Sequence, residues 1–408
     1  MAGSTALRDQ LPREAERLLS FGKGSAVPGG FAWLDDDGRP VERDLELWIT
    51  CRMTHCFALG QLLGHDGSAD LVAHGMEALT GAFRDNDFGG WFAAVGRRDG
   101  TLVPTRDAKE AYGHAFVILA ASSAAAAGHM AGRELLAEAL ALHDRRFWEP
   151  DRGMVKESWD RTFSELEPYR GANAVMHTVE AYLAASDVTG DGVWRARAVA
   201  MLGTVVDRWA RGNGWRVPEH FTPSWEQLPE YNRDDPAHPF RPFGATVGHA
   251  LEWARLSLAA QAAVGEAELP WALEASAALF DRAVGDGWEA DGAEGFVYTT
   301  GWDGEVVVGN RMHWVVAEAI GAAASLHRVT GDDRYAVWSQ TWWDYVEEHL
   351  RDPERGSWHH ELDRDNRPAS GTWTGKPDIY HALQATLMAA LPLHPSFASA
   401  LKAGASPR

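Results

Sequence analysis

Apolar residues recur along this chain at the spacing that places them on one face of an α-helix, at i, i+3, i+4 and i+7. Strand-like alternation is rare and short, with the clearest cases at 295–300 and 305–308. The pattern therefore predicts an all-α protein of about twelve helices with short β-hairpins in the loops. The helical segments lie near residues 6–20, 46–64, 69–84, 108–127, 132–147, 172–188, 192–211, 243–264, 270–285, 311–329, 332–350 and 376–392.

The predicted helices are of two kinds. Segments 247–263 (VGHALEWARLSLAAQAA) and 313–326 (HWVVAEAIGAAASL) are rich in Ala, Leu and Trp nearly all round, as expected of helices buried on every side. Segment 332–351 (DDRYAVWSQTWWDYVEEHLR) has mixed polarity, which suits a helix that covers a buried one. An inner ring covered by an outer ring predicts six helical hairpins closed into an (α/α)6 barrel.

Loops at alternate junctions carry a loose glycine–tryptophan repeat, as at 87–91, 285–288 and 355–358. A toroid of hairpins requires such a recurring supersecondary unit. No proline-rich or serine-rich linker divides the chain. We therefore expect one catalytic domain over residues 1–408.

The charge balance narrows the classes of partner. Lys and Arg total 38 against 58 Asp and Glu, a formal net charge of −20, which disfavours nucleic acids and anionic membrane surfaces. No segment approaches the roughly 18–20 apolar residues that span a bilayer, and the first thirty residues lack the apolar core of a signal peptide. Cys51 and Cys56 would point in different directions on a helix, so neither a mutual disulfide nor a cysteine-based zinc site is expected. We expect a cytoplasmic protein.

Tryptophan is unusually frequent, with 19 residues. Most must fill the core, where each indole N–H needs a partner. A few could form pocket walls whose faces suit the C–H patches of a sugar ring.

The first candidate for chemistry is the segment 241–253, in which a glycine-containing turn leads into a predicted helix. His249 and Glu252 are i and i+3 on one face, so the carboxylate could orient the imidazole and leave its other nitrogen to handle a proton. A buried pair that only ties the helix down explains the spacing equally simply.

A second histidine holds an equivalent place. Pro377 suits the first turn of a helix, which would put His381 about one turn in. If the inner helices run parallel, His249 and His381 project into the same end of the barrel.

Polar pairs recur on three further predicted helices. Taken singly, each is more often structural, but buried polar groups are costly without partners or a ligand. The pairs are Asn173 with His177, Trp314 with Glu318, and Trp48 with Arg52, the last followed by His55.

Other motifs are weak or absent. His359, His360 and Glu361 are adjacent and point apart, and no zinc-protease or facial-triad spacing occurs. Nucleotide-binding glycine motifs and the serine-hydrolase elbow are also missing. Glycoside hydrolysis by two carboxylates remains open, although a pocket dominated by histidines favours proton abstraction.

The sequence resembles the N-acylglucosamine 2-epimerase superfamily and, within it, the aldose–ketose isomerase branch. The matching stretches are residues 47–55 (LWITCRMTH), 173–177 (NAVMH), 248–253 (GHALEW) and 376–381 (KPDIYH). One departure is Val247, where the family often has proline.

The resemblance implies the (α/α)6 barrel, a reaction without metal or other cofactor, and His249 and His381 as the acid–base pair. It further implies a monosaccharide substrate. The residues that it implies around the sugar are Trp48, Arg52, Tyr112, Asn173, His177, Arg241, Glu252, Trp314 and Glu318. We expect a monomer or homodimer.

The chemistry expected of such a pocket begins with opening of the pyranose ring. A histidine then removes the weakly acidic C2 proton, giving a cis-enediol whose developing oxyanion accepts hydrogen bonds from Arg52 or another histidine. Proton return to C1 gives the ketose, and return to the opposite face of C2 gives the epimer. A sugar 2-epimerase, a non-catalytic sugar-binding protein and a glycoside hydrolase on the same barrel therefore remain alternatives.

Overall fold

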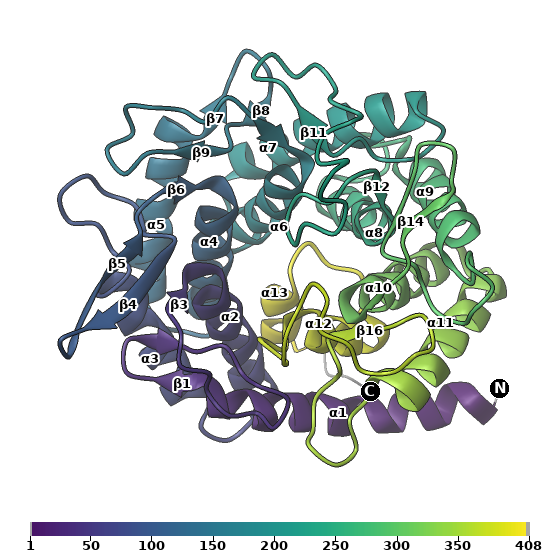
Figure 1. The fold of residues 1–408 in the computed structure, drawn as a ribbon, viewed down its shortest axis with the longest axis horizontal. Coiled ribbons are helices and arrows are strands. Elements are labelled where there is room, and N and C mark those ends of the chain that lie inside the picture. The colour runs from purple at the N-terminus through teal and green to yellow at the C-terminus, as the bar shows by residue number, and fades with distance from the viewer. Residues whose placement is uncertain (1, 405–408) are drawn as a thin grey trace.

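Two concentric rings of helices surround a central axis in the computed structural model, which describes residues 2–404 (Figure 1). The inner helices are α2 (Leu47–Leu63), α4 (Ala111–Ala126), α6 (Ala172–Thr189), α8 (Val247–Val264), α10 (His313–Thr330) and α12 (Tyr380–Ala390). The outer helices are α1 (Ala2–Gly22), α3 (Ser68–Thr80), α5 (Met130–Arg146), α7 (Gly192–Leu202), α9 (Ala272–Gly287) and α11 (Asp333–Tyr345).

Neighbouring inner helices pack against one another around the ring, and α12 returns to contact α2. Each inner helix is covered by the outer helix that follows it, except α12, which is covered by α1 from the beginning of the chain. The six hairpins therefore close by joining the first helix to the last. The predicted (α/α)6 barrel is confirmed.

The difference between inner and outer helices follows their sequences. Every residue of α4 except Tyr112 is buried, whereas α11 buries only Tyr335, Trp342, Trp343 and Tyr345. A helix apolar on all sides is stable only when protein surrounds it, and an amphipathic helix supplies that cover.

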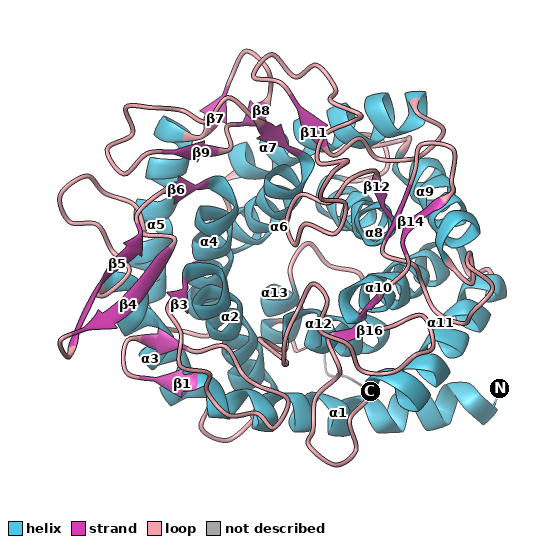
Figure 2. Cartoon of the chain, viewed as in Figure 1, coloured by secondary structure: helices cyan, strands magenta, loops and turns pink. Residues whose placement is uncertain are grey.

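Short strands gather at one rim of the barrel (Figure 2). Five of the inner helices begin directly after a two-residue strand: β3, β6, β10, β12 and β15 precede α2, α4, α6, α8 and α10. Each of these strands pairs antiparallel with a strand from another loop, which fixes where its helix begins. This explains why α4 and α8 begin several residues later than periodicity alone predicts.

The strands are β1 (Ala26–Val27), β2 (Gly30–Phe31), β3 (Leu45–Glu46), β4 (Ala94–Arg98), β5 (Thr101–Arg106), β6 (Lys109–Glu110), β7 (Trp148–Glu149), β8 (Met154–Val155), β9 (Ser158–Trp159), β10 (Arg170–Gly171), β11 (His220–Phe221), β12 (Ala245–Thr246), β13 (Thr299–Thr300), β14 (Val306–Val308), β15 (Arg311–Met312) and β16 (Glu361–Leu362). The predicted strand at 295–300 is shorter than expected, because only its last two residues join a sheet, while Phe296 makes an isolated bridge to Trp288. The hairpin of β4 and β5 was not predicted.

Three differences at helix ends affect the site or its surroundings. Helix α12 begins at Tyr380, so Pro377 lies before the helix and His381 is its second residue rather than one turn in. Turns of π-helix, Gly203–Ala210 and Val346–Leu350, extend α7 and α11. A short helix that periodicity did not predict, α13 (Phe397–Lys402), packs against α2, α4 and α6.

Two fully buried lysines brace the loops of the glycine–tryptophan repeat. Lys109 Nζ donates to Asp85 Oδ2 at 2.9 Å, and Lys376 Nζ donates to Asp352 Oδ2 at 2.7 Å. The aspartates begin the repeated loops, and the lysines lie just before α4 and α12. Breaking such a pair would leave an uncompensated buried charge, so each pair holds its loop firmly against the barrel.

Among the described residues, no helix combines the length and the apolar character needed to cross a membrane.

Candidate active site

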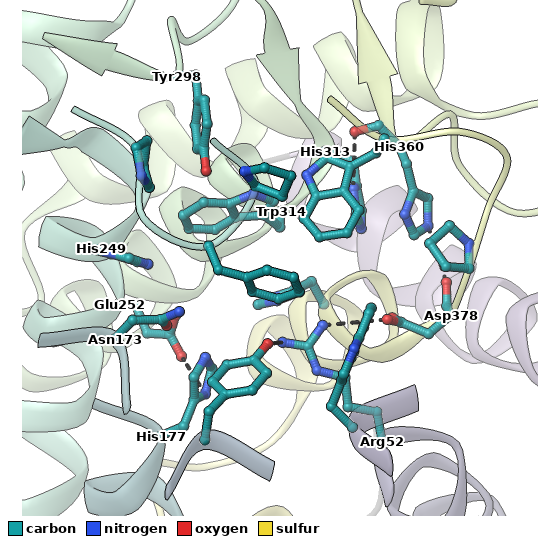
Figure 3. A pocket seen from close by; sticks show the side chains of 18 residues that line it. Arg52, Asn173, His177, His249, Glu252, Tyr298, His313, Trp314, His360 and Asp378 are labelled. Atoms are coloured by element: carbon teal, nitrogen blue, oxygen red, sulfur yellow. Dashed lines mark hydrogen bonds and ion pairs between the residues drawn. The ribbon is translucent and has the colours of Figure 1, made fainter. Parts of the chain in front are cut away.

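The N-terminal turns of all six inner helices meet at one cavity (Figure 3). Parallel inner helices produce this arrangement, because each hairpin returns the chain to the same end of the barrel. The lining residues are Trp48, Arg52, Tyr112, Asn173, His177, Pro239, Phe240, Pro242, His249, Glu252, Tyr298, His313, Trp314, His360, Trp373, Pro377, Asp378 and His381.

His249, near the start of α8, is held by a carboxylate from a distant loop. Its Nδ1 lies 3.0 Å from both carboxylate oxygens of Glu219. Glu219 directly precedes β11, and its backbone carbonyl accepts a hydrogen bond from Ala172 at the start of α6. The prediction that Glu252 orients His249 is therefore wrong. Glu219 lies 30 residues upstream of His249, and no sequence spacing indicates that partnership.

His381, near the start of α12, is held in the same way. Its Nδ1 lies 3.0 Å from Glu318 Oε1, and Glu318 is fully buried behind it. Glu318 does not line the cavity, so its place is that of a support for His381 rather than a direct sugar contact.

The two imidazoles flank one indole. The ring of Trp314 lies 5.3 Å from that of His249 and 5.8 Å from that of His381, measured between centroids. In each pair the carboxylate can only accept, so Nδ1 carries the hydrogen and Nε2 keeps a lone pair. Burial, followed by the positive charge of Arg52, holds the pKa of His381 well below its ordinary value, so that its ring is neutral.

Arg52 reaches the cavity from α2. Its guanidinium donates to Tyr112 Oη at 3.0 Å and to Asp378 Oδ2 at 3.3 Å, and it lies 4.6 Å from the ring centre of Phe116. Only 7% of Arg52 is exposed, so this is a built-in cation rather than a solvated side chain. Asp378, two residues before the start of α12, was not predicted as a site residue.

A buried polar network lies beneath the cavity. Arg255 donates to Glu252 Oε1 at 2.9 Å and also bonds to Glu318. His177 Nδ1 lies 3.7 Å from Glu180 Oε2 and 3.9 Å from Glu252 Oε1. Burial, followed by the charge of Glu318, raises the pKa of Glu252 well above its ordinary value. Burial alone would also raise the pKa of Glu180, but the neighbouring His177 and Arg255 and a hydrogen bond from Tyr380 hold it low.

The network contains one set of side chains with the spacing of metal ligands. Among the described residues, the ligand atoms of His177, Glu180 and Glu252 alone lie within 4.8 Å of one another. Arg255 already bonds to Glu252 and lies 3.9 Å from Glu180 Oε1, so it supplies the positive charge that a metal would bring. The donor set is thus occupied by an internal ion pair and fits a metal poorly.

Most sequence-predicted residues meet at the cavity, and two, Glu318 and Arg241, do not line it. Trp48, Tyr112 and Asn173 line the cavity, as expected. Arg241 instead lines an adjoining outer cavity, where it makes a two-pronged ion pair with Glu167 at 2.7 and 3.0 Å. Its guanidinium is thereby held by Glu167 of another loop and does not reach the main cavity.

Several lining residues were missed by sequence reasoning. Asp378 lies within the family-like stretch 376–381, and His360 belongs to the adjacent pair His359 and His360, whose spacing offers no metal site. The others are Phe240, Tyr298, His313 and Trp373. Of the 19 tryptophans, Trp48, Trp314 and Trp373 line the cavity, in keeping with the indole-walled pocket.

Comparisons with known proteins extend over nearly the whole chain. The family model described as N-acylglucosamine 2-epimerase (GlcNAc 2-epimerase) matches residues 29–385. A D-mannose isomerase of Thermobifida fusca is 52% identical over 399 residues, covering 97% of each chain. A D-mannose isomerase of Pseudomonas cannabina pv. alisalensis is 46% identical, covering 98% of this chain and 96% of the relative.

Solved structures of a D-mannose isomerase and a cellobiose 2-epimerase have the same fold as this chain. A crystal structure of D-mannose isomerase superposes with a TM-score of 0.87 at 29% identity, covering 93% of this chain and 97% of the other. The cellobiose 2-epimerase of Spirochaeta thermophila has a TM-score of 0.81 at 21% identity, covering 95% and 96%, and shares the fold. The sequence match and the architecture together show that the chain belongs to the N-acylglucosamine 2-epimerase family.

Proposed function

We propose that this protein is an aldose–ketose isomerase that interconverts D-mannose and D-fructose without a metal ion or other cofactor. The observation that carries the proposal is the pair of His–Glu dyads, His249–Glu219 and His381–Glu318, which face one cavity. The two relatives with the highest identities quoted above are both D-mannose isomerases, which supports the same substrate and product.

The reaction begins with ring opening. One neutral histidine takes the proton of the anomeric hydroxyl on its Nε2 and then delivers that proton to the ring oxygen, which leaves an open-chain aldose. The neutral Nε2 of the other dyad histidine then removes the C2 proton, which leaves the conjugate base of the cis-enediol with its negative charge on O1. Transfer of the O2 proton to O1 and return of the histidine's proton to C1 yield the ketose.

The dyads serve this chemistry in two ways. Each glutamate fixes its imidazole in the tautomer whose Nε2 is basic, and it stabilises the imidazolium that forms when the proton is taken. Burial and the charge of Arg52 lower the pKa of His381, so its ring is a weaker base than that of an ordinary histidine. We therefore assign removal of the C2 proton to His249 and ring opening to His381.

The other cavity residues hold the substrate. Arg52 is proposed to stabilise the developing oxyanion, since it is the buried cation of the cavity wall. Asn173, His177 and Glu252 offer hydrogen bonds to hydroxyls, and Trp48, Tyr112 and Trp314 offer ring faces or edges to C–H groups.

A sugar 2-epimerase is the second candidate, because two bases on opposite sides of a planar enediol would permit proton return to either face of C2. The presence of two dyads supports this alternative as well. A non-catalytic sugar-binding protein would not need two oriented His–Glu pairs, so the dyads do not favour that alternative.

The deciding experiment incubates purified, EDTA-treated protein with mannose, glucose, fructose, lyxose and sulfoquinovose and separates the products by chromatography. Fructose from mannose is the expected result. Glucose as the only product of mannose would identify an epimerase, and sugar binding without turnover would identify a binding protein. One catalytic domain over residues 1–408, a monomeric or homodimeric state and a cytoplasmic location belong to the same proposal.

A further inference from the structure

Two stacked histidines form one side of the cavity, away from His249 and His177 (Figure 3). The ring centroids of His313 and His360 lie 3.7 Å apart, with an angle of 28° between the ring planes. Both residues are buried, and neither has a role in the proton transfers proposed above.

Backbone carbonyls fix the hydrogen of each ring. His313 Nδ1 lies 3.2 Å from the carbonyl oxygen of His360, and His360 Nε2 lies 3.1 Å from that of Asp378. A carbonyl can only accept, so each of these nitrogens carries a hydrogen. In the neutral rings the remaining nitrogens, His313 Nε2 and His360 Nδ1, are therefore acceptors.

The rings remain neutral at ordinary pH. Burial lowers the pKa of His313 to about 4, and burial together with His313 lowers that of His360 well below its ordinary value. His313 Nε2 is buried and has no hydrogen-bond partner among the described residues. A buried acceptor without a partner is costly unless a ligand donates to it.

The cavity offers an anionic substituent no cation other than Arg52. Among the lining residues, Arg52 is the single guanidinium or ammonium group, and it is already paired with Asp378. The side formed by His313, His360 and Asp378 thus presents acceptors and a carboxylate. A hydroxyl can donate to such a surface, whereas a phosphate or sulfonate would be desolvated there without a counter-ion.

We propose that His313, His360 and Asp378 form a selectivity wall that accepts hydrogen bonds from sugar hydroxyls and excludes sugars carrying an anionic substituent. The inference rests on the proposed isomerase function and restricts it to neutral aldoses. Discrimination of this kind comes from the repulsive contact as much as from the favourable one.

The first test uses the unmodified protein with mannose, 6-O-methylmannose and mannose 6-phosphate. The methyl ether controls for bulk at the same position. We expect kcat/KM for the phosphate to be at least tenfold lower than that for the methyl ether. A smaller ratio, including equal loss with both substituted sugars, would overturn the inference while leaving mannose turnover, and so the proposed function, intact.

The second test adds a cation to the wall. His360→Lys should raise kcat/KM for mannose 6-phosphate relative to 6-O-methylmannose at least tenfold. His359→Lys is the matched control, because His359 is adjacent but does not line the cavity, and the ratio should change less than twofold. An unchanged ratio in a folded His360→Lys protein, judged by its thermal midpoint, would contradict the proposal.

Binding measurements distinguish failure of the proposed isomerase function from failure of the selectivity wall. If the protein converts no sugar at all, the proposed function fails, and calorimetric titration of the unmodified protein with mannose and mannose 6-phosphate still tests the wall. Tighter binding of mannose by at least tenfold is expected. Equal binding of the two sugars would overturn the inference. If the His360→Lys protein does not fold, this binding measurement on the unmodified protein tests the inference in its place.

Discussion

Glu219 and His249 form a dyad in which Nδ1 of the imidazole lies 3.0 Å from both carboxylate oxygens. Beside the same indole, that of Trp314, His381 Nδ1 lies 3.0 Å from Glu318 Oε1. The two dyads arise differently, because Glu318 comes from the neighbouring inner helix α10 and Glu219 from a loop. Both leave an imidazole Nε2 to act on the substrate.

Replacing Glu219 by Gln tests the first dyad. The amide keeps the size of the side chain but loses the charge that holds the Nδ1 hydrogen and stabilises the imidazolium. We expect kcat to fall by about 100-fold or more, in the range typical of acid–base catalysis, with a small change in KM. Glu226→Gln on the same loop is the control, since Glu226 is exposed. A Glu219→Gln enzyme with full kcat would mean that His249 does not depend on the dyad.

Replacing His249 or His381 by Asn tests the division of labour. Each change should lower kcat by about 10²–10⁴-fold while sugar still binds, because the loss concerns proton transfer rather than contact area. In D₂O the unmodified enzyme should place deuterium on C1 of fructose, measured by NMR. If neither variant loses even tenfold, about 1.4 kcal/mol, the two histidines are not the acid–base pair.

Arg52→Lys separates geometry from charge. Lysine keeps the positive charge but cannot reach Tyr112 and Asp378 with two parallel N–H groups. We expect kcat/KM to fall at least tenfold with a thermal midpoint close to that of the unmodified protein. A variant that is destabilised yet fully active would show that Arg52 serves stability alone.

Chelation tests the absence of a metal requirement. Arg255 bonds to Glu252 and Glu318, so the carboxylates beneath the cavity already have a cationic partner. Activity on mannose should therefore survive exhaustive dialysis against EDTA. Loss of turnover that added divalent ions restore would direct attention to the group His177, Glu180 and Glu252.

Stability should depend on pH through buried histidines. Burial lowers the pKa of several rings from 6.5: His114 and His143 to about 3, and His55, His177 and His313 to about 4. Below pH 6.5 these histidines bind protons in the unfolded chain but stay neutral in the folded protein. The free energy of unfolding should therefore fall as the pH drops from 6.5 towards 4.

Glu157 acts in the opposite direction, because burial raises its pKa to about 7 and the folded state takes up a proton there first. Burial also raises the pKa of Glu46, Glu110 and Glu252. The histidines outnumber these carboxyls, because burial lowers the pKa of His220, His360 and His381 as well. Urea unfolding at pH 7.5, 6 and 5 measures the slope, and His143→Gln should flatten it. Stability that increases on acidification would contradict the assignment of these rings as buried and neutral.

The sequence alone determined the helical architecture. The period of apolar residues is a local property, and it located the inner and outer helices to within a few residues. It also placed His249 and His381 at the starts of two inner helices, because a hairpin toroid returns each inner helix to the same end. Arg52, Asn173 and His177 were found for the same reason, since each lies on an inner helix whose position is set by periodicity.

Only the tertiary structure decided which side chains meet across loops. Glu219 reaches His249 because β10 pairs with β11, and no local pattern records that pairing. Arg241 turns to Glu167 instead of the cavity because a carboxylate from another loop is within reach. His360 enters the cavity because β16 pairs with β15 next to α10. Such contacts join residues far apart in the chain, so they follow from packing rather than from any period in the sequence.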